Sequence, residues 1–188
     1  MTASKKADKI DDNDLVARAI QELPYGTRAY ESLMRRYFRL IGQTCQRMLR
    51  DPHEAEEARQ DIMLKVFNAL PRFEGRASFK TWLLRISTNT CITRIQKRKL
   101  EAARYVSDSE MPIQEFAGDA GEDPSTQPDN EFEALTSSLS SDELQLVTLR
   151  FVGDLGLGEI AEVMGIGLSA TKMRYYRALE KLKAEQQQ

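Results

Sequence analysis

The stretch DPHEAEEARQDIMLKVFNALPRFEGRASFKTWL, residues 51–83, contains the clearest signals of secondary structure in this chain. Asp51 is suited to cap a helix, Pro52 suits its first turn, and the glutamates that follow favour the positive end of the helix dipole. The helix is expected to end before Pro71, and Ser78 is expected to cap the next helix. The inward face of the first of these helices is predicted to consist of four residues at helical spacing: Ala58, Ile62, Val66 and Leu70.

Helical periodicity extends to both sides of this stretch. Upstream, an apolar stripe recurs at i, i+3, i+4, i+7, i+8 and i+11: Tyr30, Leu33, Met34, Tyr37, Phe38 and Ile41. Downstream, Ser78 opens a helix with four residues on one side: Phe79, Trp82, Leu83 and Ile86. Ser140 and Glu143 have capping-box spacing, followed by a helical face: Leu144, Val147, Thr148 and Phe151. No alternating strand pattern occurs, so the sequence predicts an all-α protein.

Charge divides the 188 residues into segments, although the net charge is only −2. Between Arg28 and Arg104 there are 17 basic and 8 acidic residues, a net charge of +9. Between Tyr105 and Glu143 there are 11 acidic residues and no basic one. Residues 105–130 are also rich in Pro, Gly and Ser, which is typical of a flexible linker. We therefore expect a tail at 1–11, a basic helical domain at 12–104, an acidic linker at 105–129 and a second helical domain at 130–188.

Several function classes find no support in the sequence. No apolar run is long enough to cross a bilayer and no signal core is present, so we expect a cytoplasmic protein. Cys45 and Cys91 lack CxxC spacing, which favours free thiols, and with His53 they fit no usual metal site. The glycines of GDLGLGE, residues 153–159, lack the Lys-Ser/Thr of a phosphate loop. A single histidine and no paired nucleophile and base predict neither an enzyme nor a cofactor.

The C-terminal part has the pattern of a helix-turn-helix. A short helix from Gly158 to Met164 is followed by a Gly-containing turn and by a longer helix that Ser169 opens. The expected core comprises Ile160, Val163, Ile166, Met173 and Leu179. The second helix leaves four cations for solvent or DNA: Lys172, Arg174, Arg177 and Lys181. A helix of this kind fits the major groove, but a plain helical hairpin with a solvated face would have the same pattern.

The stretch FEGRASFKTWLLRISTN, residues 73–89, mixes aromatic and basic side chains around Gly75. Unstacked nucleic acid is bound by this combination, because bases stack on rings while cations follow the backbone. The alternative is that Phe79, Trp82 and Ile86 only form core. We expect a helix that is half core and half strand-binding surface, with the loop as a base pocket.

AEEARQDIMLKVFNALPRFEGRASFKTWLLRISTN, residues 55–89, and EIAEVMGIGLSATKMRYYRALEKL, residues 159–182, together resemble a bacterial RNA polymerase sigma factor of the extracytoplasmic-function (ECF) group. The resemblance covers roughly residues 12–104 and 130–184. It implies binding to core RNA polymerase, at the β′ clamp and β flap, and to promoter DNA. It also suggests an anti-sigma partner, with no small-molecule substrate and no membrane insertion.

The resemblance also implies roles for individual residues. Those matching the clamp-binding helix are Glu56, Glu57, Gln60, Asp61 and Phe67, although helix-dipole stabilisation alone also explains the acidic ones. Those matching the loop and helix that capture the −10 element are Phe73, Arg76, Ser78, Phe79, Lys80 and Asn89. Those matching the −35 reading helix are Ser169, Thr171, Lys172, Arg174, Tyr175 and Arg177.

The departures from the family pattern concern the promoter sequence that the chain would prefer, and not its fold. Tyr175 and Tyr176 are bulkier than the residues of many members, and Ile92 stands near a place where relatives often have a cation. The acidic linker would thread the RNA channel of the polymerase, or act only as a spacer. Two rival functions remain: a polymerase-independent helix-turn-helix regulator, and a module that binds RNA or single strands.

Overall fold

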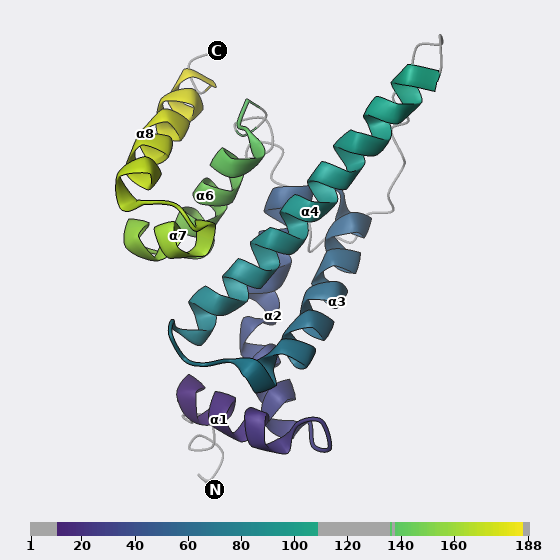
Figure 1. Ribbon diagram of the computed structural model, residues 1–188, viewed down its shortest axis with the longest axis vertical. Coiled ribbons are helices and arrows are strands. Elements are labelled where there is room, and N and C mark those ends of the chain that lie inside the picture. Colours follow the sequence, from purple (N-terminus) through teal and green to yellow (C-terminus); the bar gives the residue numbers. More distant parts are fainter. Residues whose placement is uncertain (1–10, 109–135, 137, 186–188) are drawn as a thin grey trace, which may run out of the picture.

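The computed structural model describes residues 11–108, 136 and 138–185. These residues form seven α-helices and one short 3-10 helix, and they contain no strand (Figure 1). In chain order the elements are α1 (Asp12–Glu22), α2 (Arg28–Leu49), α3 (Pro52–Ala69), η1 (Leu70–Arg72), α4 (Phe79–Asp108), α6 (Ser141–Phe151), α7 (Leu157–Met164) and α8 (Leu168–Glu185). The predicted all-α fold is confirmed.

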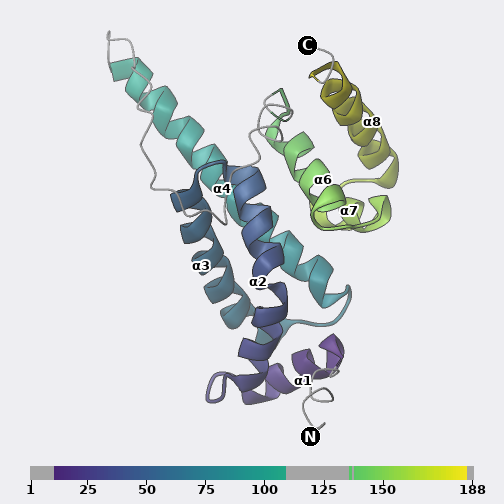
Figure 2. The same cartoon turned by 180° about the vertical axis from the view of Figure 1, so that it is seen from behind.

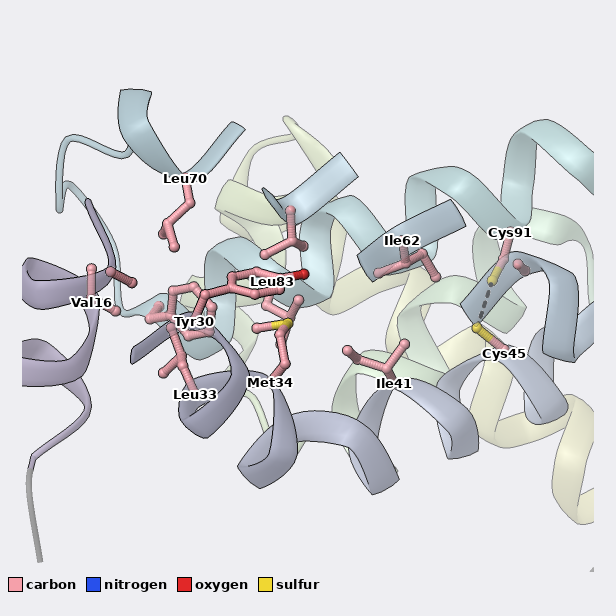
Figure 3. Close-up of a cluster of buried hydrophobic side chains, with 14 of the residues drawn as sticks. Val16, Tyr30, Leu33, Met34, Ile41, Cys45, Ile62, Leu70, Leu83 and Cys91 are labelled. Atoms are coloured by element: carbon pink, nitrogen blue, oxygen red, sulfur yellow. Dashed lines mark hydrogen bonds between the residues drawn. The ribbon is translucent and has the colours of Figure 1, made fainter. Parts of the chain in front are cut away.

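Helices α2, α3 and α4 pack into one apolar core (Figure 3). Leu33 and Ile41 of α2, Ile62 of α3 and Leu83 of α4 are fully buried there. The four residues predicted for one inward face are all fully buried, three of them in α3 and Leu70 at the start of η1, which confirms the predicted register. Phe38 is the exception in the stripe of α2: it is 42% exposed and its ring lies under the guanidinium of Arg59, 4.1 Å away.

The helix boundaries follow the capping residues read from the sequence. The carboxylate of Asp51 accepts a hydrogen bond from the backbone N–H of Glu54 (2.8 Å), and Pro52 occupies the first turn of α3. The hydroxyl of Ser78 accepts one from the N–H of Thr81 (3.1 Å) at the start of α4. Each such cap typically contributes about 1 kcal/mol.

Helix α1 was not singled out from the sequence. It lies across the ends of α2 and α4, burying Leu15, Val16 and Ala19 (Figures 1 and 2). Asp12 holds it in place, because its carboxylate pairs with Arg36 (2.7 Å) and accepts a hydrogen bond from the hydroxyl of Tyr37. Burial and this hydrogen bond raise the pKa of Tyr37 well above the ordinary value of a phenol.

Helices α6, α7 and α8 form the second helical part. The predicted capping box is present: Ser140 and Glu143 exchange hydrogen bonds of 2.8 and 3.3 Å at the start of α6. Gly165 ends α7 with a positive φ of 67°, a conformation that favours glycine, and α8 begins three residues later. The helix-turn-helix prediction is therefore confirmed in its geometry.

Two residues predicted for the faces of these helices lie on the surface instead. Met173 was expected in the core, but it is 58% exposed, because Thr171 and Ala178 mark the buried side of α8. Phe151, at the end of α6, is 59% exposed. By contrast, all residues from Leu144 to Leu149 are buried, so α6 is covered on every side rather than along one stripe.

The second part lies along one side of α4, as both views show (Figures 1 and 2). Helix α4 extends to Asp108, so it includes the first residues of the segment expected to be a linker. The remainder of that acidic segment, most of the N-terminal tail, and the start of the second domain expected at residue 130 fall outside the described residues.

Candidate nucleic-acid interface

The loop between η1 and α4 is the segment for which the sequence predicts a base pocket. Helix α3 ends at Ala69, Pro71 lies within η1, and Gly75 turns the chain with a positive φ of 71°. No atom lies within 4 Å of the position where a Cβ of Gly75 would stand, so its backbone is openly accessible. Glycine at this point thus serves the turn and leaves the loop free to approach a ligand closely.

Aromatic rings meet directly beneath this loop. Phe73 lies 5.0 Å from Trp82 and 6.1 Å edge-on from Phe79, measured between ring centroids. Phe79 also contacts Tyr37 at 5.3 Å and is only 3% exposed, so its ring is core and has no face free for a base. Phe73 and Trp82 are half-buried, and they are the rings that the loop leaves at the surface.

A cavity of about 260 Å³ opens beside these rings. Phe73, Trp82 and three arginines line it from the first domain: Arg72, Arg76 and Arg85. Arg76 is mostly exposed and pairs with Glu74, while Glu162 and Val163 of α7 line the opposite side. The cavity combines ring faces with guanidinium groups, which is the chemistry that binds a base and its phosphate.

The remaining residues predicted for this surface are spread along α4. Ser78 is exposed next to the cavity and its hydroxyl also contacts that of Thr81 (2.8 Å). Lys80 is half-buried and does not line the cavity. Asn89 is exposed further along the helix, where its side-chain oxygen accepts a hydrogen bond from Gln145 of α6 (3.4 Å). The structure thus places Phe73 and Arg76 in the pocket, Ser78 at its edge, and Asn89 away from it.

A second surface runs along α3. Glu57, Gln60 and Asp61 are exposed at successive turns, and Glu56 accepts a hydrogen bond from Gln60 (3.1 Å). Phe67 lies near the C-terminal end of α3 and is half-buried. Its ring packs edge-on against that of Tyr30, with the ring centroids 5.2 Å apart. The five residues predicted for polymerase binding therefore belong to one helix, four of them clustered near its start.

Arginine 94 of α4 fixes the acidic part of this surface. Its guanidinium pairs with Asp61 and with Glu57 (3.2 Å), and the hydrogen bond that it donates to Asp61 is the main reason that the pKa of Arg94 is raised. Leu64 stands one turn beyond Gln60 and is 61% exposed. Leu64 was not among the residues predicted for this surface, although an apolar side chain four residues after Gln60 on a polar face is a feature that the sequence displays.

A third surface is the outer face of α8. Ser169, Lys172 and Arg177 are exposed on it, and Arg174 pairs with Asp142 at 2.9 Å. Thr171 is fully buried and its hydroxyl donates to the carbonyl of Gly167 (3.1 Å), so it shapes the turn rather than the surface.

The two tyrosines of α8 have different surroundings. Tyr175 packs partly against the buried cluster of the second domain, while Tyr176 is 60% exposed, with the two ring centroids 5.7 Å apart. Met173 is also exposed, although the helix-turn-helix pattern of the sequence predicted that its side chain would lie in the core. Together these side chains give α8 an apolar strip between its cations.

The part of the chain that the structure describes offers little support for metal, membrane or disulfide chemistry. No cluster of three or more metal-ligating side chains occurs among those residues. None of their helices combines the length and apolar character that crossing a membrane requires. Cys45 and Cys91 are buried free thiols with their sulfur atoms 4.0 Å apart, and their hydrogen bond and burial raise the pKa of Cys91 (Figure 3).

Comparison with known proteins gives two family matches in the order expected. Sigma-70 region 2 matches residues 33–101, and sigma-70 region 4 matches residues 137–184. The chain is 28% identical over 183 residues to the ECF RNA polymerase sigma factor SigW of Bacillus subtilis (strain 168), covering 91% of this chain and 96% of SigW.

Two solved structures share the fold at a TM-score of 0.65. One is CnrH in complex with the cytosolic domain of CnrY, at 22% identity over 92% of this chain and 95% of that chain. The other is the sigma factor RpoE in complex with the anti-sigma factor NepR from Bartonella quintana, at 21% identity over 84% and 96%.

Proposed function

Because this chain belongs to the ECF group of sigma-70 RNA polymerase sigma factors, we propose that it binds core RNA polymerase and directs it to specific promoters. The observation that carries the proposal is the presence of both sigma-70 regions in one chain, each folded with an exposed surface of the required chemistry. Residues 12–104 act as the polymerase-binding and −10 domain, residues 130–188 as the −35 domain, and residues 105–129 as their tether.

Helix α8 reads the −35 element as duplex. Lys172 and Arg177 are exposed cations positioned for phosphates, and Ser169 at the start of the helix is positioned for base edges. Arg174 reaches DNA once it leaves Asp142. The exposed side chains of Met173 and Tyr176 offer apolar contacts, such as those to thymine methyl groups. Thr171 contributes by holding the turn, and Tyr175 by packing beneath the helix.

The loop and the first turns of α4 capture the −10 element as a single strand. A base stacks on Phe73 or Trp82, while Arg76 and the neighbouring arginines neutralise its phosphates. Phe79 supports these rings from the core, and Ser78, Lys80 and Asn89 extend the surface along the strand. Strand opening is thereby driven by binding, since stacking and phosphate contacts offset the lost base pairing, and the chain needs no catalytic group of its own.

The exposed face of α3 docks on the clamp of the polymerase. Glu57 and Asp61 present carboxylates that Arg94 holds in place, with Gln60 beside them and Leu64 as an apolar anchor. Phe67 packs at the end of the same helix. Acting with polymerase on promoters places the protein in the cytoplasm, and an anti-sigma protein is a further partner of the class seen with RpoE.

The test is transcription from a pool of genomic promoter fragments, with the purified chain plus core RNA polymerase and with core alone as control. Transcripts that require the chain, sharing two sequence boxes upstream of their starts, are the expected result. Gel filtration with core measures binding separately. A folded chain that binds core yet yields no specific transcript on any fragment would refute promoter specificity.

A further inference from the structure

The cavity beside the loop is lined by three charged side chains that form no hydrogen bond or ion pair with any residue that the structure describes: Arg72, Arg85 and Glu162. The other charged groups of its lining, Arg76 and Glu74, pair with each other. All three unpaired side chains are exposed, so they are accessible from solvent. Unpaired charges of both signs at one cavity indicate a ligand that carries both negative charge and hydrogen-bond donors.

The unpaired charges reach the cavity from two parts of the fold. Arg72 belongs to η1 and Arg85 to α4, whereas Glu162 belongs to α7. Helix α7 lies beside the first turns of α4 in both views (Figures 1 and 2). The cavity therefore presents two guanidinium groups from the first domain and a carboxylate from the second.

Only one of the two glutamates of α7 is left for a ligand. One carboxylate oxygen of Glu159 accepts a hydrogen bond from the hydroxyl of Thr81 (3.1 Å), and the other accepts one from the backbone N–H of Gly156 (2.9 Å). Glu159 is thus satisfied within the protein and holds the start of α7 against α4. Glu162 follows three residues later and lines the cavity with both oxygens unused.

The rings and the size of the cavity fit a single nucleotide. Phe73 and Trp82 are half-buried there, with their ring centroids 5.0 Å apart. The volume of about 260 Å³ lies just below the range of about 300–1,000 Å³ that is typical of small-molecule pockets. A base stacks on such rings, and a phosphate is the anion that guanidinium groups bind best.

The carboxylate of Glu162 discriminates between bases. An ionised carboxylate only accepts hydrogen bonds, and its two oxygens accept from two adjacent donors. Guanine has two such donors, N1–H and N2–H, on its Watson–Crick edge. Adenine and cytosine have one amino group next to an acceptor nitrogen, which a carboxylate repels. A site that uses a carboxylate in this way rejects bases that lack the second donor, so it favours guanine.

We propose that this cavity binds a free guanine nucleotide: its base stacks on Trp82 and pairs with Glu162, while its phosphates bind the two unpaired arginines. The binding itself is independent of the proposed function. Its consequence for transcription rests on the proposed function, because the nucleotide and the −10 strand need the same rings and exclude each other. A free guanine nucleotide is then a competitive regulator of strand capture.

The emission of Trp82 reports binding directly, since it is the only tryptophan of the full chain. GDP should quench this emission saturably. ADP should require a concentration at least about tenfold higher, because a hydrogen bond to a charged group is lost. Guanosine, which lacks phosphates, should also bind at least about tenfold more weakly than GDP. Absence of saturable quenching by GDP, or equal affinities for GDP and ADP, would overturn the proposal.

Two substitutions separate recognition of the base from recognition of the phosphates. Glu162→Gln should abolish the preference for GDP over ADP, whereas Arg85→Gln should weaken both about tenfold and keep the preference. Matched controls are Glu180→Gln on α8 and Arg18→Gln on α1, which change exposed side chains outside the cavity and should bind GDP like wild type. Thermal unfolding verifies that each variant is folded. A folded Glu162→Gln protein that still prefers GDP would show the assignment to be wrong.

Competition on the unaltered chain distinguishes a free nucleotide from a guanine within a strand. A single strand that lacks guanine should displace GDP, because both need the rings of Phe73 and Trp82. Quenching by guanine-containing strands but not by GDP would identify the strand as the ligand and overturn the proposal, and GDP that no strand displaces would overturn competitive regulation. Absence of specific transcription without added GDP, in a chain that binds GDP as expected, would instead refute the proposed function.

Discussion

Replacing Phe73 and Phe79 separately distinguishes a ring that stacks on DNA from a ring that only supports the fold. Phe73 is half-buried at the cavity, whereas Phe79 is 3% exposed and contacts three other rings. Phe73→Leu conserves most of the apolar volume, so the free energy of unfolding should fall by less than about 1.5 kcal/mol. Phe79→Ala leaves a cavity in the core and should cost about 3–5 kcal/mol.

Promoter opening and core binding, measured together, should separate the roles of the two rings. Losing one stacked base removes about 1–3 kcal/mol, which lowers open-complex formation by about 5- to 140-fold in the Phe73→Leu holoenzyme. Core binding by Phe73→Leu should be unchanged, while Phe79→Ala should lose core binding and opening together as it unfolds. Chemical denaturation measures stability, and permanganate reactivity of unpaired thymines measures opening.

Further measurements on the two variants distinguish stacking on DNA from a purely structural role. The Phe73→Leu holoenzyme should still bind the −35 duplex, because α8 is untouched. Normal opening by Phe73→Leu would show that Trp82 alone, or neither ring, stacks on the strand. A Phe79→Ala protein that stays folded and binds core, yet fails to open promoters, would return Phe79 to the base pocket.

Three further outcomes follow from exposed or paired side chains. Leu64→Ala should leave stability within about 0.5 kcal/mol but weaken core binding about fivefold or more in gel-shift titration, whereas Leu100→Ala, also exposed, should not. Arg177→Ala should weaken binding to all −35 sequences alike. It should also reduce the slope of the logarithm of the binding constant against the logarithm of the salt concentration by about 1. Burial raises the pKa of Glu143, but hydrogen bonds led by that from Lys181 outweigh it and lower the pKa below the ordinary value. Glu143→Gln should therefore lower Tm at neutral pH by the equivalent of about 1 kcal/mol, and the difference from wild type should vanish as pH falls through the folded pKa.

Much of the fold could be predicted because local signals agreed with the tertiary packing. The cap at Asp51, the capping box at Ser140 and the four inward residues of α3 and η1 each depend on short-range spacing, which the sequence displays directly. Helix α1 was not anticipated, because its burial depends on where α2 and α4 end. Met173 was misplaced because one turn of α8 carries apolar residues on both sides, and only packing against α6 and α7 decides which side is buried.

The candidate site could be predicted in residue type but not in accessibility. Aromatic and basic residues near Gly75 indicated a nucleic-acid surface, yet periodicity could not separate Phe73, at the cavity, from Phe79, in the core. Leu84 shows the same limit. It occupies a helical apolar position like any core residue, and nothing in its neighbourhood along the chain indicates that its partners come from a different domain.

The packing of the helix-turn-helix domain on α4 also determines which of the proposed surfaces are accessible. In both views α3 lies on one side of α4 and the helix-turn-helix domain on the other (Figures 1 and 2). Glu57 and Asp61 are thus available to polymerase while Asn89 is engaged by Gln145. The face of α3 proposed for polymerase binding is therefore accessible in this structure, whereas Asn89, at the far end of the proposed −10 surface, is in contact with α6.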